Sequence, residues 1–194
     1  CNGSTSLAAY PERAQLRHVP SFETASHDEL TSQLARAAEA ASNVLSEVAN
    51  RVLASLEPLT AGPAATPAAG DSSALLDGFW YPGELGWSSH GQSGPPPSPC
   101  PAHVDPGLIT IIVDDIEALE VQTPDGCWER IKPQCGFAVA IAGRELAALT
   151  QGRVPTCTHR VALTKRSRTS LAYEVRLGLH GLNAVAQWPA TRDS

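Results

Sequence analysis

From residue 107 onward the chain becomes a succession of short apolar segments separated by turn signals, and this pattern limits the fold most strongly. The segment 108–113 is rich in β-branched residues, and 119–122 alternates apolar and polar side chains. The turn signal at 123–126 predicts that 127–131 pairs with the preceding strand as a hairpin. Other β-branched or aromatic segments predict further strands at 75–82, 137–141, 159–163 and 170–177. Many short strands of this kind indicate a mainly β sandwich or barrel.

One long helix is expected ahead of the strand-rich region, over residues 28–57. Apolar residues recur there at three- and four-residue spacing, as in an amphipathic helix. Asp28 or Ser26 can cap its start, and Pro58 ends it. We interpret this helix as structural, with its apolar stripe packed on the domain that follows. A second, short helical or turn segment is expected at 145–150.

The length of 194 residues suits one domain with one buried core. The chain has no methionine and starts at Cys1, so we expect it to be the remnant of a longer protein. Residues up to 27 are polar and contain two prolines, and they are expected to be irregular. The predicted organisation is an N-terminal segment and helix over 1–57, a linker over 58–74, a strand-rich core over 75–180 and a tail over 181–194.

Charge and cysteine usage limit the class of partner and the compartment. The formal net charge is −6, which argues against a nucleic-acid partner or an anionic membrane surface. There are five cysteines, an odd number, without a CxxC pair, so a reducing, cytoplasmic compartment is expected. No apolar run approaches ~18 residues, so no transmembrane helix is expected. The expected partner is a small-molecule substrate, and no association with a membrane is expected.

A candidate metal site starts at His103 and Asp105, which lie just before the strand 108–113. In an extended segment, residues two apart point to the same side, so both can face one metal ion. His159 heads a later strand and can supply a third ligand. Two histidines and one carboxylate form the facial triad of non-haem Fe(II) oxygenases. The pattern alone is weak, because zinc uses the same donors and many histidines before strands are structural.

A candidate anion site follows nine residues after His159, where Arg168 and Ser170 share one side of a strand. A guanidinium is a planar, bidentate donor for a carboxylate, and a serine hydroxyl adds a further donor. Alone, Arg168 would be read as a solvated surface charge. Beside a metal-ligand strand, the pair suits a dicarboxylate co-substrate that chelates iron with its other end.

Several ordered motifs between about residues 75 and 177 together resemble a known family. They are Phe79-Trp80-Tyr81-Pro82, the stretch from His103 through Asp115, the hairpin from Leu119 to Pro133, Gly143 through Val154, His159-Arg160-Val161, and Arg168-Thr169-Ser170. Each is similar to the corresponding segment of the isopenicillin N synthase-like and plant-type Fe(II) 2-oxoglutarate-dependent dioxygenases. The upstream Tyr81 corresponds to a tyrosine that contacts the co-substrate carboxylate in that family.

The resemblance implies a double-stranded β-helix, the cupin-like jelly roll, with an N-terminal packing helix. It implies an enzyme that uses Fe(II), 2-oxoglutarate and O2 to oxidise a C–H bond, with hydroxylation expected, and that releases succinate and CO2. The implied catalytic iron ligands are His103, Asp105 and His159. The residues implied to hold 2-oxoglutarate are Arg168, Ser170 and Tyr81.

Two positions depart from the family pattern, and two other functions stay open. Phe79 stands where the family usually has asparagine, and Arg144 follows Gly143 where the family has aspartate. One alternative is an Fe(II) oxidase of the same family that does not use 2-oxoglutarate. The other is a non-catalytic jelly-roll binding module with a vestigial site. Stoichiometric succinate separates the two enzymes, and substitution of Asp105 would change little in the third case.

Overall fold

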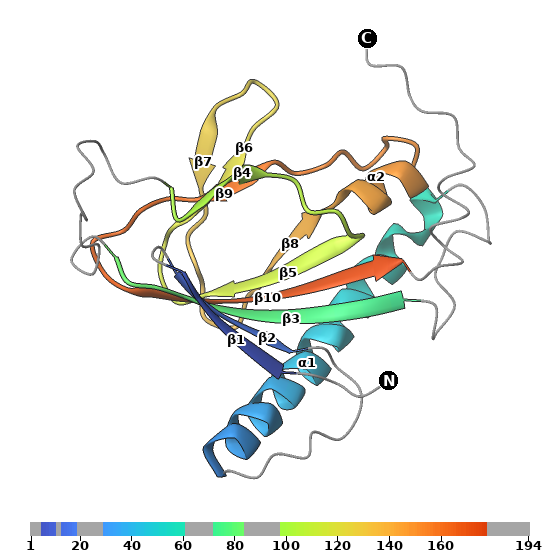
Figure 1. The fold of residues 1–194 in the computed structure, drawn as a ribbon. Helices are drawn as coiled ribbons and strands as arrows, with labels where there is room; N and C mark the ends of the chain where they lie inside the picture. The colour runs from blue at the N-terminus through green and yellow to red at the C-terminus, as the bar shows by residue number, and fades with distance from the viewer. Residues whose placement is uncertain (1–4, 11–12, 19–28, 61–71, 84–97, 178–194) are drawn as a thin grey trace.

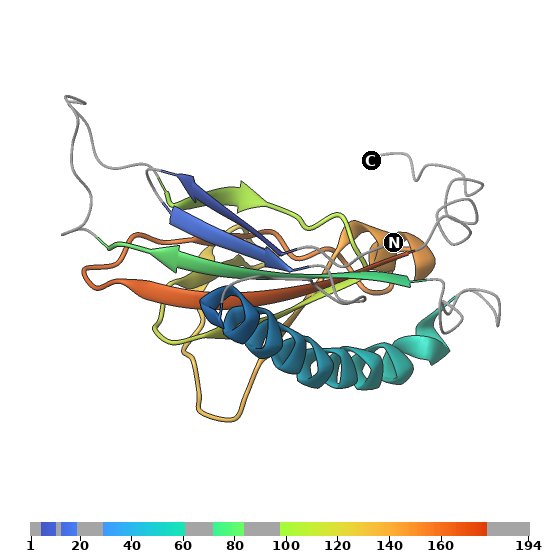
Figure 2. The same ribbon diagram turned by 60° about the horizontal axis from the view of Figure 1, so that its bottom comes forward.

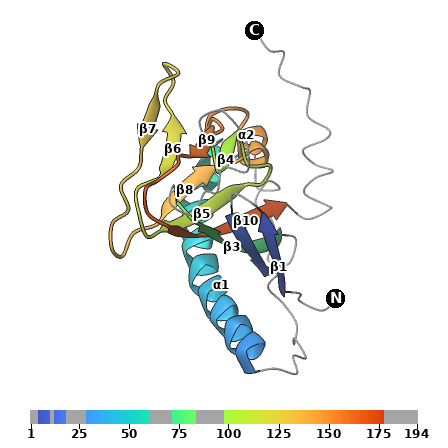
Figure 3. The same cartoon turned by 60° about the vertical axis from the view of Figure 1, so that its left-hand side comes forward.

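The computed structural model describes residues 5–10, 13–18, 29–60, 72–83 and 98–177. They form two antiparallel β-sheets and a long helix, stacked as three layers (Figure 1). The smaller sheet lies on one side of the larger sheet, and the helix covers the other side (Figure 3). Within these ranges no helix combines the length and the apolar character needed to cross a lipid bilayer.

The strand order of the two sheets defines the fold. The larger sheet has the order β1 (Thr5–Tyr10), β2 (Arg13–His18), β3 (Ser72–Tyr81), β10 (Arg168–Leu177), β5 (Ile109–Asp114), β8 (Val139–Ala142). The smaller sheet has the order β4 (Cys100–His103), β9 (His159–Val161), β6 (Leu119–Gln122), β7 (Trp128–Arg130). From β3 to β10 the chain passes back and forth between the two sheets. This alternation is that of a double-stranded β-helix, so the predicted mainly β jelly roll is confirmed.

The long helix α1 (Glu29–Leu56) lies across the outer face of the larger sheet (Figure 2). Its buried residues recur at helical spacing and include Ala38, Leu45 and Ala49. They belong to one apolar cluster with sheet residues such as Ile111 and Tyr173. The expected structural helix, with its apolar stripe on the domain, is therefore confirmed. A short 3-10 turn (η1, Glu57–Leu59) containing Pro58 follows it.

Most of the expected strands form within one to three residues of the predicted positions, and α2 (Arg144–Leu149) forms at the expected short helix. The prediction of an irregular segment up to residue 27 is wrong where it can be checked, because β1 and β2 form a hairpin on the edge of β3. Both prolines lie outside these strands. Pairing of β2 with β3 supplies backbone hydrogen bonds between segments distant in the chain, and the local sequence pattern does not predict them. The strand β3 also starts at Ser72, inside the predicted linker, and the predicted tail 181–194 lies outside the described residues.

Candidate metal and co-substrate site

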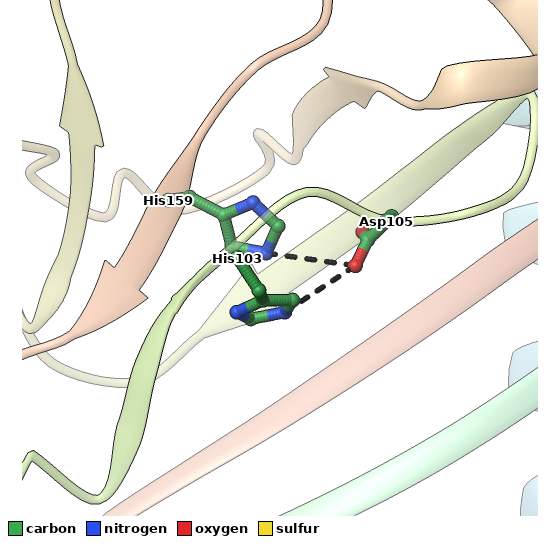
Figure 4. Close-up of side chains that lie close together, drawn as sticks. All are labelled: His103, Asp105 and His159. Carbon is green, nitrogen blue, oxygen red and sulfur yellow. Dashed lines mark ion pairs between the residues drawn. The ribbon is translucent and has the colours of Figure 1, made fainter.

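The two histidines of the predicted triad face each other across two paired strands. His103 is the last residue of β4 and His159 is the first residue of β9. The antiparallel register of β4 and β9 places the two residues opposite each other, and their ring centroids lie 4.2 Å apart. Asp105 lies in the connection from β4 to β5 and points its carboxylate at both rings (Figure 4). The three predicted ligands therefore meet at one point.

The donor atoms are spaced as the ligands of a single ion would be. The Oδ1 atom of Asp105 lies 3.4 Å from Nε2 of His103 and 3.7 Å from Nε2 of His159. One ligand atom from each of the three residues lies within 4.8 Å of the others. The Nδ1 atoms of the histidines contact the carbonyl oxygens of Pro101, at 2.8 Å, and Cys157, at 3.2 Å. A carbonyl can only accept, so each Nδ1 donates, and Nε2 is left to bind a metal.

The ionisation of the triad follows from these contacts. The hydrogen bond with Asp105, followed by the contact with Cys100, raises the pKa of His103 from 6.5 to about 10. Burial alone would raise the pKa of the Asp105 carboxyl, but hydrogen bonds from His103 and Thr110 hold it below its usual value. Burial lowers the pKa of His159. A metal ion at this point would take the place of the His103 proton, since coordination requires neutral histidine and ionised aspartate.

The start of α2 holds the loop that carries Asp105. The backbone N–H of Arg144 donates to the carbonyl oxygen of Asp105 at 3.0 Å. A Cβ atom at Gly143 would lie 2.1 Å from the carbonyl oxygen of Gly107, so only glycine allows this close packing. The side chain of Arg144 is exposed. Any residue except proline could make this backbone contact, so the departure from the family's aspartate does not remove it.

All six predicted site residues line one cavity of about 110 Å³ between the two sheets. On β10, Arg168 lies opposite Tyr81 of β3, and Ser170 lies opposite Phe79. These four side chains therefore share the face of the larger sheet that looks toward the triad. Phe79 stacks on Tyr81 with ring centroids 6.0 Å apart and extends the apolar wall beside it.

The guanidinium of Arg168 is buried and only partly paired. Its side chain is 2% exposed, and Nη2 donates to Oδ1 of Asp114 at 2.5 Å. The guanidinium carbon lies 5.0 Å from the centroid of the Tyr81 ring. Within the described part of the chain, Nε and Nη1 have no hydrogen-bond partner. Because an unpaired buried donor costs about 1–3 kcal/mol, this side chain fits an anion bound in the cavity.

Sequence reasoning missed several residues of this cavity. Thr110 donates to Asp105, and Asp114 pairs with Arg168. The polar positions Asp77 and Glu174 and the thiol of Cys100 also line the cavity. The alternation along β5 could have indicated Thr110 and Asp114, since both lie on its cavity face. Their partners could not be foreseen, because these depend on contacts between distant segments.

A double-stranded β-helix that brings two histidines and a carboxylate to one point has the ligand set of the non-haem iron oxygenases. Residues 88–177 match the family model described as the 2OG-Fe(II) oxygenase superfamily. The matched residues make up just under half of the chain, and plant 2-oxoglutarate-dependent dioxygenases are among the similar proteins. The predicted resemblance is therefore confirmed.

The similar curated proteins match part of the chain. A 73-residue stretch is 44% identical to the 2-oxoglutarate-dependent dioxygenase AOP3 of Arabidopsis thaliana and covers 37% of this chain and 18% of that protein. A 114-residue stretch is 38% identical to gibberellin 20 oxidase 2 of Oryza sativa subsp. indica and covers 53% of this chain and 25% of that protein. A 70-residue stretch is 43% identical to a protein named probable inactive 2-oxoglutarate-dependent dioxygenase AOP2, from Arabidopsis thaliana, and covers 36% of this chain and 18% of that protein. The matched stretches thus span about a fifth of the length of these relatives.

Solved structures share the fold over most of the chain. The rice dioxygenase for auxin oxidation superposes with a TM-score of 0.66 at 19% identity, covering 91% of this chain and 60% of that one. A full-length Neurospora crassa protein, solved in complex with alpha-KG and 5-formyluracil, superposes with a TM-score of 0.65 at 17% identity, covering 95% of this chain and 67% of that one. At these identities the likeness shows the fold, which is the predicted jelly roll.

Proposed function

We propose that the protein is an Fe(II)- and 2-oxoglutarate-dependent dioxygenase that oxidises, and in the expected case hydroxylates, a C–H bond of a small molecule. The observation that carries this proposal is the pairing, in one cavity, of a His-Asp-His cluster with a buried arginine that has unpaired donors. When bound, Fe(II), O2 and 2-oxoglutarate would supply the oxidation, with release of succinate and CO2. Residues 88–177 match the superfamily that carries out this chemistry.

We assign the metal ligands to His103, Asp105 and His159. The backbone contacts at Nδ1 orient both rings so that Nε2 points at the carboxylate of Asp105. These three side chains would hold the ion and would leave its remaining positions to the co-substrate and oxygen. The two sheets enclose this point, and apolar side chains such as Ile112 and Leu119 on the cavity wall reduce the water around it.

We assign the co-substrate contacts to Arg168, Ser170 and Tyr81. The unpaired Nε and Nη1 donors of Arg168 would receive the far carboxylate of 2-oxoglutarate, and the hydroxyl of Ser170 lies on the same side of β10. The ring of Tyr81 packs under the guanidinium and helps to fix its position. Structures of similar fold solved with alpha-KG, or with 2OG and Fe, support this co-substrate.

A second candidate is an Fe(II) oxidase that does not use 2-oxoglutarate. The ion pair between Arg168 and Asp114 favours it, because the guanidinium already faces one carboxylate. In that case the remaining donors of Arg168 would bind a carboxylate of the substrate itself. The third possibility is a binding module without activity. It stays open because one similar protein is named as probable inactive.

The proposal is tested by anaerobic visible absorption of the protein with Fe(II), followed by 2-oxoglutarate. We expect a weak metal-to-ligand charge-transfer band that is lost in Arg168→Ala at limiting 2-oxoglutarate. Arg166→Ala is the matched control, because this nearby arginine is exposed, and it should keep the band. Iron binding without the band would support the oxidase. Failure of the folded protein to bind iron would support the non-catalytic module.

We further propose a small-molecule substrate and a cytoplasmic location. The metal point lies in a concave cavity between the two sheets, which is the usual shape of a small-molecule site. The four cysteines in the described ranges are free thiols, and the total of five is odd, as suits a reducing compartment. Fractionation of the source cells with an antibody against this chain tests the location, and recovery in a membrane or secreted fraction would contradict it.

A further inference from the structure

The two oxygens of the Asp105 carboxylate have different partners. Oδ1 faces the histidine rings, 3.4 Å from Nε2 of His103 and 3.7 Å from Nε2 of His159. Oδ2 accepts a hydrogen bond from the Oγ1 hydroxyl of Thr110. Figure 4 shows Asp105 with a single oxygen turned toward both rings. The carboxylate thus offers one oxygen to the metal point while the other is held by the protein.

Thr110 is well placed to hold a loop carboxylate in position. It lies inside β5, opposite Glu174 of β10 and Ile141 of β8, so its backbone is paired on both sides. The residue is 4% exposed and lines the cavity. A β-branched side chain has few rotamers, so the hydroxyl has a nearly fixed direction. Asp105, by contrast, lies in the connection between two strands and depends on its contacts for its orientation.

Resting on the proposed function, we propose that Thr110 is a positioning residue that makes Asp105 a one-oxygen ligand of the iron. Without this hydrogen bond, Oδ2 would be an unpaired charged atom in a carboxylate that is 14% exposed, or it would turn toward the metal. A carboxylate bound through both oxygens would occupy an additional coordination position. The hydroxyl of Thr110 therefore both orders the ligand and keeps open the positions that the co-substrate and oxygen require.

The test compares variants that keep the shape of the side chain or keep its donor. Thr110→Val preserves the branched shape and removes the hydroxyl, whereas Thr110→Ser preserves the hydroxyl. Fe(II) and Co(II) dissociation constants are measured by anaerobic titration without 2-oxoglutarate or substrate. We expect metal binding to weaken by roughly 10- to 100-fold in Thr110→Val and to stay near the wild-type value in Thr110→Ser. Thr110→Ala provides the same comparison if the valine is not accommodated.

Thr150→Val is the matched control for loss of a buried threonine hydroxyl. Thr150 is 0% exposed, and its Oγ1 donates to the carbonyl oxygen of Leu146 at 2.9 Å, at the end of α2. This variant should unfold at a lower temperature while it binds both metals like the wild type. The absorption spectrum of bound Co(II) should change in Thr110→Val and stay constant in Thr150→Val, because only the former alters the carboxylate ligand.

The outcomes separate this inference from the function on which it rests. Wild-type metal affinity in Thr110→Val, or an equal loss of affinity in Thr150→Val, would overturn the role of Thr110 and leave the metal site standing. A folded wild-type protein that binds neither Fe(II) nor Co(II) would overturn the proposed function, and the inference with it. Weak binding in Thr110→Val together with recovery in Thr110→Ser would establish the positioning role.

Discussion

Along β10, successive side chains enter two different environments on opposite faces of the larger sheet. Tyr173, Val175 and Leu177 belong to the apolar cluster that packs with α1. Arg168 and Ser170 point the other way and line the cavity with the triad. Neighbouring strands follow the same rule, since Ile111 of β5 faces the helix side and Thr110 faces the cavity. One set of strands thus serves both the core and the site.

The difference between the two faces of the larger sheet shows how the fold stabilises a site whose buried polar groups lower the free energy of unfolding. Full burial of a large apolar side chain stabilises the folded state by about 1.5–3 kcal/mol, and the helix face contains many such side chains. The cavity face contains a buried guanidinium with unpaired donors, each of which costs about 1–3 kcal/mol. The apolar face therefore offsets the cost of keeping polar groups ready for a ligand. Changes on the two faces should have separable effects, on stability and on ligand binding.

The largest effect is expected from Asp105→Ala, which removes the ligand shared by both histidines. Metal binding and turnover should fall below detection, because the charged donor is lost. The unfolding temperature of the metal-free protein should fall modestly, because the contacts of the carboxylate with His103 and Thr110 are lost while the apolar clusters stay intact. Anaerobic Fe(II) titration and thermal unfolding are the two measurements. Asp125→Ala, in an exposed turn, is the control, and stoichiometric iron in Asp105→Ala would contradict the assignment.

The opposite effect is expected from Ile111→Ala on the helix face. Ile111 is 0% exposed, so its truncation should lower the free energy of unfolding by about 2–5 kcal/mol. The fraction that stays folded should bind Fe(II) with wild-type affinity, since the cavity face is unchanged. Denaturant unfolding gives the first quantity and metal titration at low temperature gives the second. A metal affinity that falls in proportion to the stability would show that the two faces are not separable.

The pH dependence of metal binding should report on the cavity face alone. The pKa of His103 is raised to about 10, so near neutral pH this ring carries a proton when no metal is bound. Coordination removes that proton, so affinity should rise with pH below about 10, by up to about tenfold per pH unit for one proton. Titration at pH 6.5, 7.0 and 7.5, with proton release measured in weak buffer, provides the check. Affinity independent of pH over this range would contradict the raised pKa of His103 in the metal-free protein.

The smallest effect is expected from Val44→Ala on the exposed side of α1. Val44 is 63% exposed, whereas the adjacent Leu45 is 6% exposed and packs in the cluster. Alanine has the higher helix propensity, so the free energy of unfolding should rise by a few tenths of a kcal/mol, up to about 0.7 kcal/mol. Chemical denaturation measures this change. A loss of more than about 1 kcal/mol would show that the exposed side of the helix is packed after all.

Several features of the protein could be predicted from the sequence, because they depend on local periodicity. The apolar stripe of α1 and the alternation in β5 and β10 indicate which side of each element is buried. The spacing of two residues places His103 beside Asp105, and Arg168 beside Ser170, without knowledge of distant contacts. The type of chemistry, a metal ion with an anion nearby, follows from these residue types.

Only the tertiary structure decided which of these local pairs meet. The register of β4 against β9 sets His159 opposite His103. Residues 13–18 form a strand by pairing with β3, and residues 5–10 form one by pairing with β2. The contacts of Thr110 with Asp105, and of Asp114 with Arg168, likewise depend on how a sheet and its connections pack. A strand's period shows which residues share a face, but its partner and register are fixed by packing between segments distant in the chain.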